Sequence, residues 1–308
     1  MLPMNARMPP TAIAPTPTHP NQSGKAGWKQ AQATAIRATP VVASNGLFIS
    51  CSRVVVDWYL YSIFRIKSQA TDMQIPILGV PISLDSKAKV LEKIGNFLRE
   101  DRFHRIATVN PEFLVLASRD NRFRENLLSA DLRVADGFGM VLAGLLQGEE
   151  VPRFPGADLL LDILSIAEKD EYSVFLAIRQ DGLSSYEEIQ STLLKKYPKL
   201  FVSGTDSELG SIGNWKLEIG NSAIVFCNYG APMQELFLAR LQEAGIKSRL
   251  AIGVGGSFDY LTGKQKRAPQ WLRAIGFEWL WRLILQPKRW RRIWNAVVVF
   301  PVKVLLKK

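Results

Sequence analysis

Cysteine and histidine are scarce in this chain of 308 residues, which contains two of each. The two cysteines, Cys51 and Cys227, are too few for a disulfide framework or a cysteine-bound metal. His19 lies in a stretch whose composition predicts disorder, which leaves His104 as the one histidine of a folded region. We therefore expect no zinc site.

Three kinds of nucleotide-binding motif are also missing. The sequence contains no Asp-x-Asp pair, so a sugar-nucleotide enzyme with this sequence would lack the usual carboxylate clamp for Mg²⁺ or Mn²⁺. No Gly-x-Gly-x-x-Gly follows the first expected strand, which argues against a nicotinamide-dependent dehydrogenase. The glycine-rich segment 253–256 lacks the lysine spacing of a nucleoside-triphosphate loop. No cofactor is expected.

Acidic side chains are absent from residues 1–56, and the first half of that segment is rich in Pro, Thr, Ala and Asn. Most of it is expected to be disordered, and the same composition suits a transit peptide or a start codon assigned too early. Residues 47–64 are apolar but carry Arg53 and Asp57. These charges favour a helix in the membrane interface, or docked on the domain, over a spanning helix. We treat residues 1–71 as an N-terminal extension.

Residues 264–308 carry the whole net charge of +11, with 12 bases and one acid, Glu278. Five tryptophans are interleaved with these bases, and two basic amphipathic helices separated by Gln286-Pro287 are expected over 278–308. Basic and aromatic residues together suit an anionic membrane surface or single-stranded nucleic acid. The aliphatic run 296–306 has no use on nucleic acid. We therefore expect a helical membrane-docking appendage and no nucleic-acid partner.

The intervening residues 72–263 alternate between strand-like and helix-like runs. The expected strands are 75–80, 105–109, 132–135, 173–178, 200–203, 223–228 and 249–253. The expected helices are 86–99, 110–117, 123–129, 139–146, 157–167, 185–197 and 234–244. This order predicts an α/β domain, with a Rossmann-like, mostly parallel sheet that carries helices on both faces.

Polar side chains follow two of these strands at their carboxyl ends, where ligands of such sheets bind. Thr108 and Asn110 close one strand, and Asp136 follows the next. Asn110 either binds a sugar or phosphate or only caps the helix that starts at Pro111, and the two roles are compatible. Asp136, before Gly137, is either a general base for a hydroxyl beside bound phosphate or the N-cap of the following helix.

The turn at residues 230–235 follows a later strand and contains Gln234 and Glu235. Gln234 is suited to a base edge and Glu235 to ribose hydroxyls. The alternative is a turn whose polar residues only open the next helix.

Several short motifs occur along the chain in a fixed order. They are Thr108-Val109-Asn110-Pro111-Glu112, Ser129-Ala130-Asp131 through Ala135-Asp136-Gly137-Phe138-Gly139, Gly156-Ala157-Asp158-Leu159, Gly230-Ala231-Pro232-Met233-Gln234-Glu235, Gly253-Val254-Gly255-Gly256-Ser257-Phe258-Asp259, Lys266-Arg267-Ala268-Pro269 and Gly276-Phe277-Glu278-Trp279. With this series, residues 74–308 resemble the WecG/TagA/CpsF glycosyltransferases, also called glycosyltransferase family 26.

The resemblance implies an inverting, metal-independent transferase of hexosyl or N-acetylhexosaminyl type. It would move a sugar from a UDP-sugar to a polyprenyl-diphosphate-linked saccharide, as a peripheral protein at the cytoplasmic face of the cell membrane. Its product would enter exopolysaccharide or cell-envelope polysaccharide. Asp136 would be the catalytic base that deprotonates the acceptor hydroxyl. The substrate-binding residues would be Thr108, Asn110, Arg153, Gly156, Asp158, Gln234, Glu235 and Asp259. Arg282, Arg289 and Arg292 would contact the membrane or the donor diphosphate.

The chain departs from the usual family pattern at Pro155 and at residues 178–181, 207–210 and 229–230. Three of these departures lie in the half expected to hold the nucleotide. They leave open a donor other than the N-acetylmannosamine type, or weaker nucleotide contacts. The alternative to an enzyme is a non-catalytic membrane-binding module with the same fold, which predicts no stabilisation by UDP.

Overall fold

The computed structural model describes residues 73–207 and 219–306. Residues 1–71, with the expected apolar helix at 47–64, lie outside the described residues. All described residues belong to one compact unit, residues 69–308.

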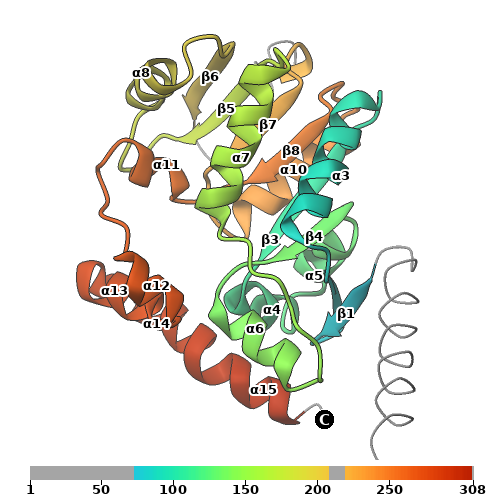
Figure 1. Ribbon diagram of the computed structural model, residues 1–308, viewed down its shortest axis with the longest axis vertical. Coiled ribbons are helices and arrows are strands. Elements are labelled where there is room, and N and C mark those ends of the chain that lie inside the picture. Colours follow the sequence, from blue (N-terminus) through green and yellow to red (C-terminus); the bar gives the residue numbers. More distant parts are fainter. Residues whose placement is uncertain (1–72, 208–218, 307–308) are drawn as a thin grey trace, which may run out of the picture. The chain divides into compact units, whose positions relative to one another are not determined.

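Six parallel strands form the central sheet, in the order β4-β3-β8-β7-β5-β6 (Figure 1). They are β3 (His104–Val109), β4 (Leu132–Ala135), β5 (Val174–Arg179), β6 (Val202–Ser207), β7 (Ile224–Cys227) and β8 (Leu250–Gly253). Every residue of β3, β4, β7 and β8 is buried, as is usual for parallel strands covered on both faces. The prediction of a mostly parallel α/β domain is confirmed.

Helices cover both faces of this sheet. Those on one face are α3 (Lys87–Arg99), α7 (Gly156–Lys169) and α8 (Tyr186–Lys196); α10 (Met233–Glu243) lies on the other. Neighbouring residues of one strand enter opposite cores, as Leu176 packs with α7 and Phe175 packs with α10. This alternation follows from the twofold period of a strand.

Residues 75–80, expected as one strand, form a hairpin instead. β1 (Gln74–Ile77) and β2 (Val80–Ser83) pair antiparallel around Leu78 and Gly79. Both turn residues have positive φ, 50° and 81°, which gives the turn the twist that a two-residue hairpin favours. The prediction of a single strand was wrong because a leucine in this conformation is rare, so the apolar run gave no turn signal.

Three short helices follow the first strands of the sheet: α4 (Pro111–Ala117), α5 (Asn121–Leu128) and α6 (Phe138–Leu145). The Asn110 side chain caps α4, since its Oδ1 accepts a hydrogen bond from the Phe113 backbone N–H at 3.0 Å. Gly139 allows α6 to approach α4 closely, because a Cβ there would lie 2.7 Å from Pro111 Cγ.

The C-terminal segment is helical and breaks at Gln286-Pro287, as predicted. α11 (Ser257–Leu261) precedes this segment. The elements of the segment are α12 (Gln270–Ala274), α13 (Glu278–Leu285), η1 (Pro287–Arg289), α14 (Trp290–Trp294), η2 (Asn295–Val299) and α15 (Phe300–Leu306). Phe300 and Val304 of α15 are buried in the core that contains α4 and α6. None of the described helices has the length and apolar content needed to cross a bilayer.

Candidate active site

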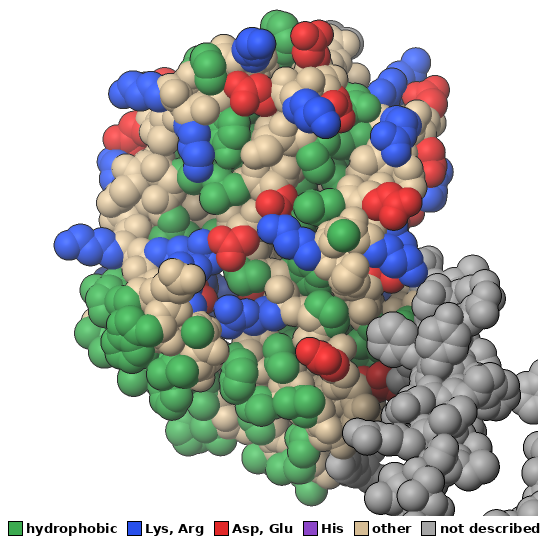
Figure 2. Space-filling model, in the orientation of Figure 1, with side chains coloured by type: hydrophobic (Ala, Val, Ile, Leu, Met, Phe, Trp, Pro, Cys, Tyr) green, Lys and Arg blue, Asp and Glu red, His purple; other side chains and the backbone are tan. Residues whose placement is uncertain are grey.

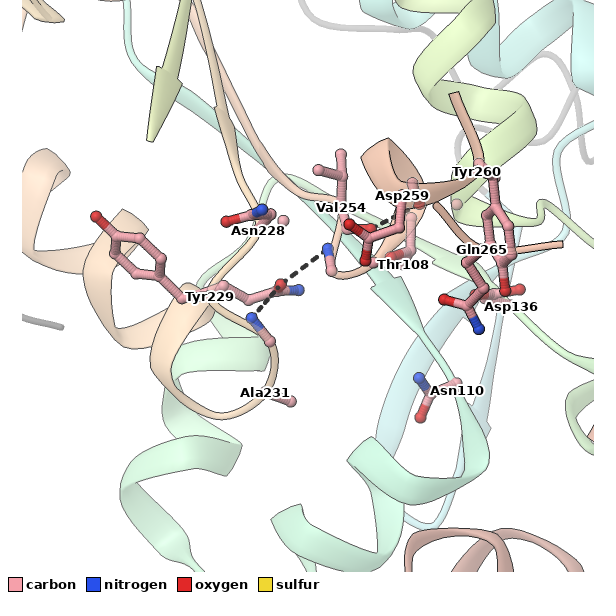
Figure 3. Close-up of a pocket in the computed structure, with 18 of the residues that line it drawn as sticks. Thr108, Asn110, Asp136, Asn228, Tyr229, Ala231, Val254, Asp259, Tyr260 and Gln265 are labelled. Atoms are coloured by element: carbon pink, nitrogen blue, oxygen red, sulfur yellow. Dashed lines mark hydrogen bonds between the residues drawn. The ribbon is translucent and has the colours of Figure 1, made fainter. Parts of the chain in front are cut away.

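A cavity of about 360 Å³ opens at the carboxyl ends of the central strands (Figure 3). Thr108 of β3 and Gly253 of β8 line it from neighbouring strands. β4 lies on one side of β3 and all later strands lie on the other, so this is the switch point of the sheet. Ligands bind at such points because the loops diverge there and leave a crevice.

Asp136 directly follows β4 and lines the cavity. Its backbone N–H donates to Val109 O at 2.8 Å, and its carboxylate accepts a hydrogen bond from the Gly156 backbone. Burial raises the pKa of this carboxyl to about 6; Arg282 lowers it and Glu278 raises it further. A carboxyl with this pKa is ionised at neutral pH and still basic enough to take a proton.

Asp136 does not cap the helix that follows it. The N-cap residue of α6 is Gly137, with φ 88°, and no side chain accepts a hydrogen bond at that helix end. The interpretation of Asp136 as an N-cap was therefore wrong. Its carboxylate is left facing the cavity.

Three oxygen atoms gather around the N-terminus of α7. Thr108 Oγ1, Asp136 Oδ2 and Ser257 Oγ lie 3.7, 3.9 and 3.9 Å from the position that a Cβ of Gly156 would take. Asn110 caps α4 and also lines the same cavity, so the geometry accommodates both roles considered for it. The cavity floor thus presents oxygen atoms from β3, the end of β4 and α11.

Gln234 links the two glycine-containing loops of the cavity wall. Its Oε1 accepts hydrogen bonds from the backbone N–H groups of Gly230 and Gly255, both at 3.1 Å (Figure 3). Its Nε2 donates to Glu235 Oε1 at 2.7 Å. Glu235 is buried beside the cavity rather than lining it, and burial raises the pKa of its carboxyl to about 7.

Arginines from the C-terminal segment close one side of the cavity. Arg282, Arg289 and Arg292 line it together, and they also line a second cavity of about 200 Å³ that shares Asp136. Arg282 binds Glu278 Oε1 at 2.9 Å, and Arg292 binds Glu112 Oε1 at 2.6 Å. Burial, with repulsion from Arg292 and Arg282, lowers the pKa of Arg289. Clustered guanidinium groups of this kind favour a bound anion.

Other predicted site residues lie at the cavity margin. Arg153 lines the second cavity and donates to the Arg273 carbonyl at 3.1 Å. Asp158 does not line either cavity; it binds both Nη atoms of Arg267, at 2.5 and 3.0 Å, and Arg267 does line the larger one. Asp158 is therefore placed to orient that guanidinium.

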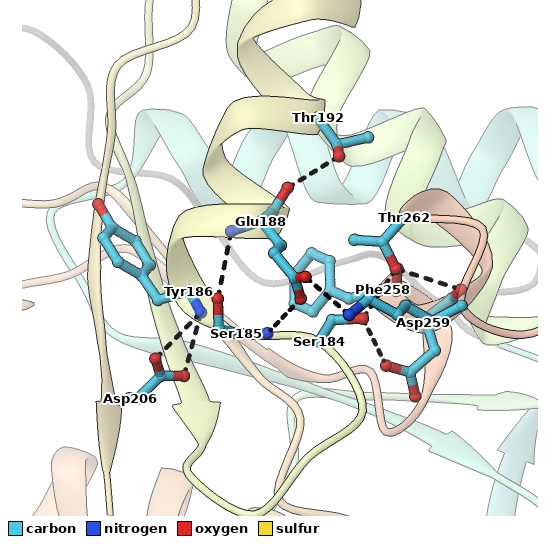
Figure 4. Close-up of polar contacts among 10 residues, drawn as sticks. Ser184, Ser185, Tyr186, Glu188, Thr192, Asp206, Phe258, Asp259 and Thr262 are labelled. Atoms are coloured by element: carbon cyan, nitrogen blue, oxygen red, sulfur yellow. Dashed lines mark hydrogen bonds and ion pairs between the residues drawn. The ribbon is translucent and has the colours of Figure 1, made fainter.

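Asp259 lines the cavity and is tied to the neighbouring loop. Its Oδ1 accepts from Ser184 Oγ at 2.9 Å, and that hydroxyl also lies 2.7 Å from Thr262 Oγ1 (Figure 4). Burial raises the pKa of the Asp259 carboxyl. These bonds hold α11 against the segment before α8.

Several cavity residues were not predicted from the sequence. They are Arg179, Asp181, Asn228, Tyr229, Tyr260, Gln265, Arg267 and Glu278. Asn228 directly follows β7, so the same strand-end argument that selected Asp136 could have found it. Arg267 and Glu278 belong to the C-terminal segment, and only the tertiary fold brings them to the cavity.

The described residues contain no group of three His, Cys, Asp or Glu side chains placed to hold a metal ion. The carboxylates that line the larger cavity each have a nearby protein partner, as with Asp181, which pairs with Arg179, and Asp259, which binds Ser184. Positive charge at this site comes from arginine side chains.

Comparison with known proteins matches residues 75–308 to the model of the glycosyl transferase WecG/TagA/CpsF family. An N-acetylglucosaminyldiphosphoundecaprenol N-acetyl-β-D-mannosaminyltransferase of Bacillus subtilis (strain 168) is 31% identical over 193 residues, 61% of this chain and 74% of the relative. A protein of the same name from Staphylococcus aureus (strain MRSA252) is 27% identical over 250 residues, 79% of this chain and 96% of the relative. The chain belongs to the WecG/TagA/CpsF family of glycosyl transferases.

Proposed function

We propose that this glycosyltransferase moves an N-acetylhexosaminyl group from a UDP-sugar to a polyprenyl-diphosphate-linked saccharide. The observation that carries the proposal is the position of Asp136, a carboxyl with a raised pKa where two arginine-walled cavities meet. The relatives are named for an N-acetylmannosaminyl donor group and a lipid-diphosphate-linked N-acetylglucosaminyl acceptor, which supports this class of substrates.

In the proposed reaction, Asp136 takes the proton from the acceptor hydroxyl. That oxygen forms a bond to the anomeric carbon while the bond from this carbon to the UDP oxygen breaks. The leaving diphosphate keeps the electron pair, and attack from the opposite side inverts the anomeric centre. Arg282, Arg289 and Arg292 stabilise the developing negative charge, as preorganised cations do in a partly buried site.

The proposal assigns no step to a metal ion. Mg²⁺ in sugar-nucleotide enzymes is held by carboxylates, and the described residues group no such ligands at the cavity. The arginine cluster supplies the charge that a cation would otherwise provide.

We further propose that the protein works as a peripheral protein on the anionic cytoplasmic face of the cell membrane, held there by residues 264–308. In this segment, Trp271, Trp290 and Trp294 are more than half exposed beside the basic side chains. Tryptophan and arginine together are typical of segments at the headgroup boundary. The same segment lines the cavity, so attachment would place the site beside a lipid-linked acceptor.

The experiment is a thermal-shift panel of UDP and UDP-sugars, followed by a transfer assay with the stabilising donor. A donor that binds the folded state raises the melting temperature through mass action. We expect UDP-N-acetylhexosamines to give such a shift and to support transfer. A protein that binds vesicles but is not stabilised by any UDP compound would instead be the non-catalytic membrane-binding module.

A further inference from the structure

Helix α6 has no polar side chain. Residues 138–146, which comprise α6 and its C-cap residue, read Phe-Gly-Met-Val-Leu-Ala-Gly-Leu-Leu. One face packs inward, where Met140, Ala143 and Gly144 are buried. A helix that is apolar on all sides is typical of a protein core or of contact with lipid.

The outer face of α6 is nevertheless exposed. Phe138, Leu142, Leu145 and Leu146 expose 37%, 46%, 57% and 40% of their surface, and their spacing puts them on one side of the helix. Single exposed leucines are ordinary on protein surfaces, but four neighbouring large apolar side chains on one short helix form a patch.

This patch continues onto the C-terminal segment. α15 contacts α6, and the Gly276 backbone packs directly against the Phe138 ring. The exposed apolar side chains of the C-terminal segment are Trp271, Ile275, Phe277, Ile284, Leu285, Trp290, Trp294, Val297, Val302, Leu305 and Leu306. Figure 2 shows hydrophobic side chains gathered over the region of α12–α15, with Lys and Arg side chains along their upper margin.

The second cavity opens at this surface. Phe138 of α6 and Val297 of η2 are both exposed and both line it, and its lining also includes Asp136 and the three arginines. An apolar rim therefore leads inward to cationic side chains and the candidate base. An apolar rim in front of a cationic interior is complementary to an amphipathic ligand that has an apolar chain and an anionic head.

We propose that the exposed face of α6 contacts the lipid bilayer together with the C-terminal segment, so that two separate parts of the chain frame the mouth of the second cavity. This inference rests on the proposed attachment to an anionic membrane. The occupant is lipid rather than protein because Lys and Arg side chains lie along the upper margin of the patch, and because the patch surrounds an opening that a dimer contact would cover. A second copy of the chain and the N-terminal segment 47–64 are the competing occupants.

The test compares Leu142→Ser/Leu145→Ser with a matched double variant, Leu194→Ser/Phe201→Ser. Leu194 and Phe201 expose 40% and 64% of their surface; Leu194 lies in α8 and Phe201 directly precedes β6, so both are outside the patch. Binding to vesicles of phosphatidylglycerol and phosphatidylcholine is measured by sedimentation in the full chain at about 0.5 M salt, where the Debye length is near 4–5 Å and screening leaves mainly apolar insertion. Sugar transfer to a soluble, short-chain analogue of the acceptor is measured in parallel, in buffer without detergent.

We expect the α6 variant to lose about tenfold in salt-resistant vesicle binding, because two half-exposed leucines no longer enter the bilayer. The control should bind as the unchanged protein does, and both should keep the same melting temperature and the same transfer to the soluble analogue. Equal vesicle binding by both variants would overturn the inference. If the unchanged protein does not transfer sugar to the soluble analogue, that result would count against the proposed function instead. A change from dimer to monomer in the α6 variant, without a change in vesicle binding, would assign the face to a second copy. If the α6 substitutions weaken vesicle binding only when residues 1–71 are also deleted, the N-terminal segment is the occupant of the α6 face in the full chain.

Discussion

The α/β body and the C-terminal segment both line the candidate active site, but they differ in net charge, in burial and in the side chains that they supply. Residues 1–263 are formally neutral, and the body's helices and strands bury extended apolar faces. Residues 264–308 carry the whole net charge, and α12, α13 and α14 have no buried residue. The body supplies Asp136, and the segment supplies Arg282, Arg289 and Arg292.

This division separates the proton acceptor from the anion-binding groups. Asp136 is fixed by the end of a buried strand and a backbone hydrogen bond, which gives it a defined position. The arginines lie in α13, η1 and α14, which have no buried residue, and this part of the segment contacts the body through polar pairs such as Arg292 with Glu112. We therefore expect the sheet of the body to form without the segment, whereas membrane attachment and neutralisation of the donor diphosphate depend on it.

The largest expected effect comes from removing residues 264–308. At about 1 kcal/mol for each Lys or Arg near an anionic surface, half of the 12 bases would account for roughly 10⁴-fold in vesicle affinity at low salt. Sedimentation with anionic vesicles checks this.

The truncation also exposes the core around Phe300, so a control must leave that contact intact. The charge variant Lys288→Gln/Arg291→Gln/Lys303→Gln does so, and its vesicle affinity should fall by about 10²-fold. A truncated protein that sediments as well as the full chain would mean that the C-terminal segment is not the anchor, and would leave α6 and residues 47–64 as the candidates.

Asp136→Asn tests the contribution of the body. The amide keeps the size of the side chain but cannot take the proton, so turnover should fall by about 10²- to 10⁴-fold while UDP binding stays close to normal. The melting temperature at pH 8 serves as the folding control and should rise. Ionised Asp136 lowers stability progressively as the pH rises from 3.8 through about 6, and the variant removes that effect. Turnover near that of the unchanged protein would remove Asp136 from the mechanism.

Gln234→Leu should affect donor binding more than chemistry. The leucine cannot accept hydrogen bonds from the Gly230 and Gly255 backbones, which would loosen both loops of the larger cavity. We expect KM for the donor to rise about tenfold and kcat to change by less than threefold, in steady-state assays. Gln242→Leu on the same helix is the matched control. A fall in kcat with unchanged KM would mean that Gln234 acts on the reacting atoms.

The smallest expected effect is that of a chelator. Turnover with EDTA should match turnover without it, because arginine side chains supply the positive charge beside Asp136. Loss of activity that Mg²⁺ restores would contradict the assignment of charge neutralisation to the C-terminal segment.

The parts of this structure that were predictable follow from local chemistry. The N-cap at Asn110 and the break at Gln286-Pro287 were read from short sequence patterns and are confirmed. The positions of Thr108 and Asp136 at one sheet edge follow from the parallel topology. The unpredicted features depend on contacts between distant residues. Neither the pairing of Asp158 with Arg267 nor the burial of Glu235 leaves a sign in the nearby sequence.

The central claim is that Asp136 of the body takes the proton from the hydroxyl group of the acceptor substrate. The pH dependence of kcat/KM tests this claim most directly. Because the ionised carboxylate is the active form and its pKa is about 6, kcat/KM should fall tenfold per unit below about pH 6 and stay level between pH 7 and 8. The residual activity of Asp136→Asn should lack this acidic limb. An acidic limb of the same slope and midpoint in Asp136→Asn would contradict the account, since another group would then be the base.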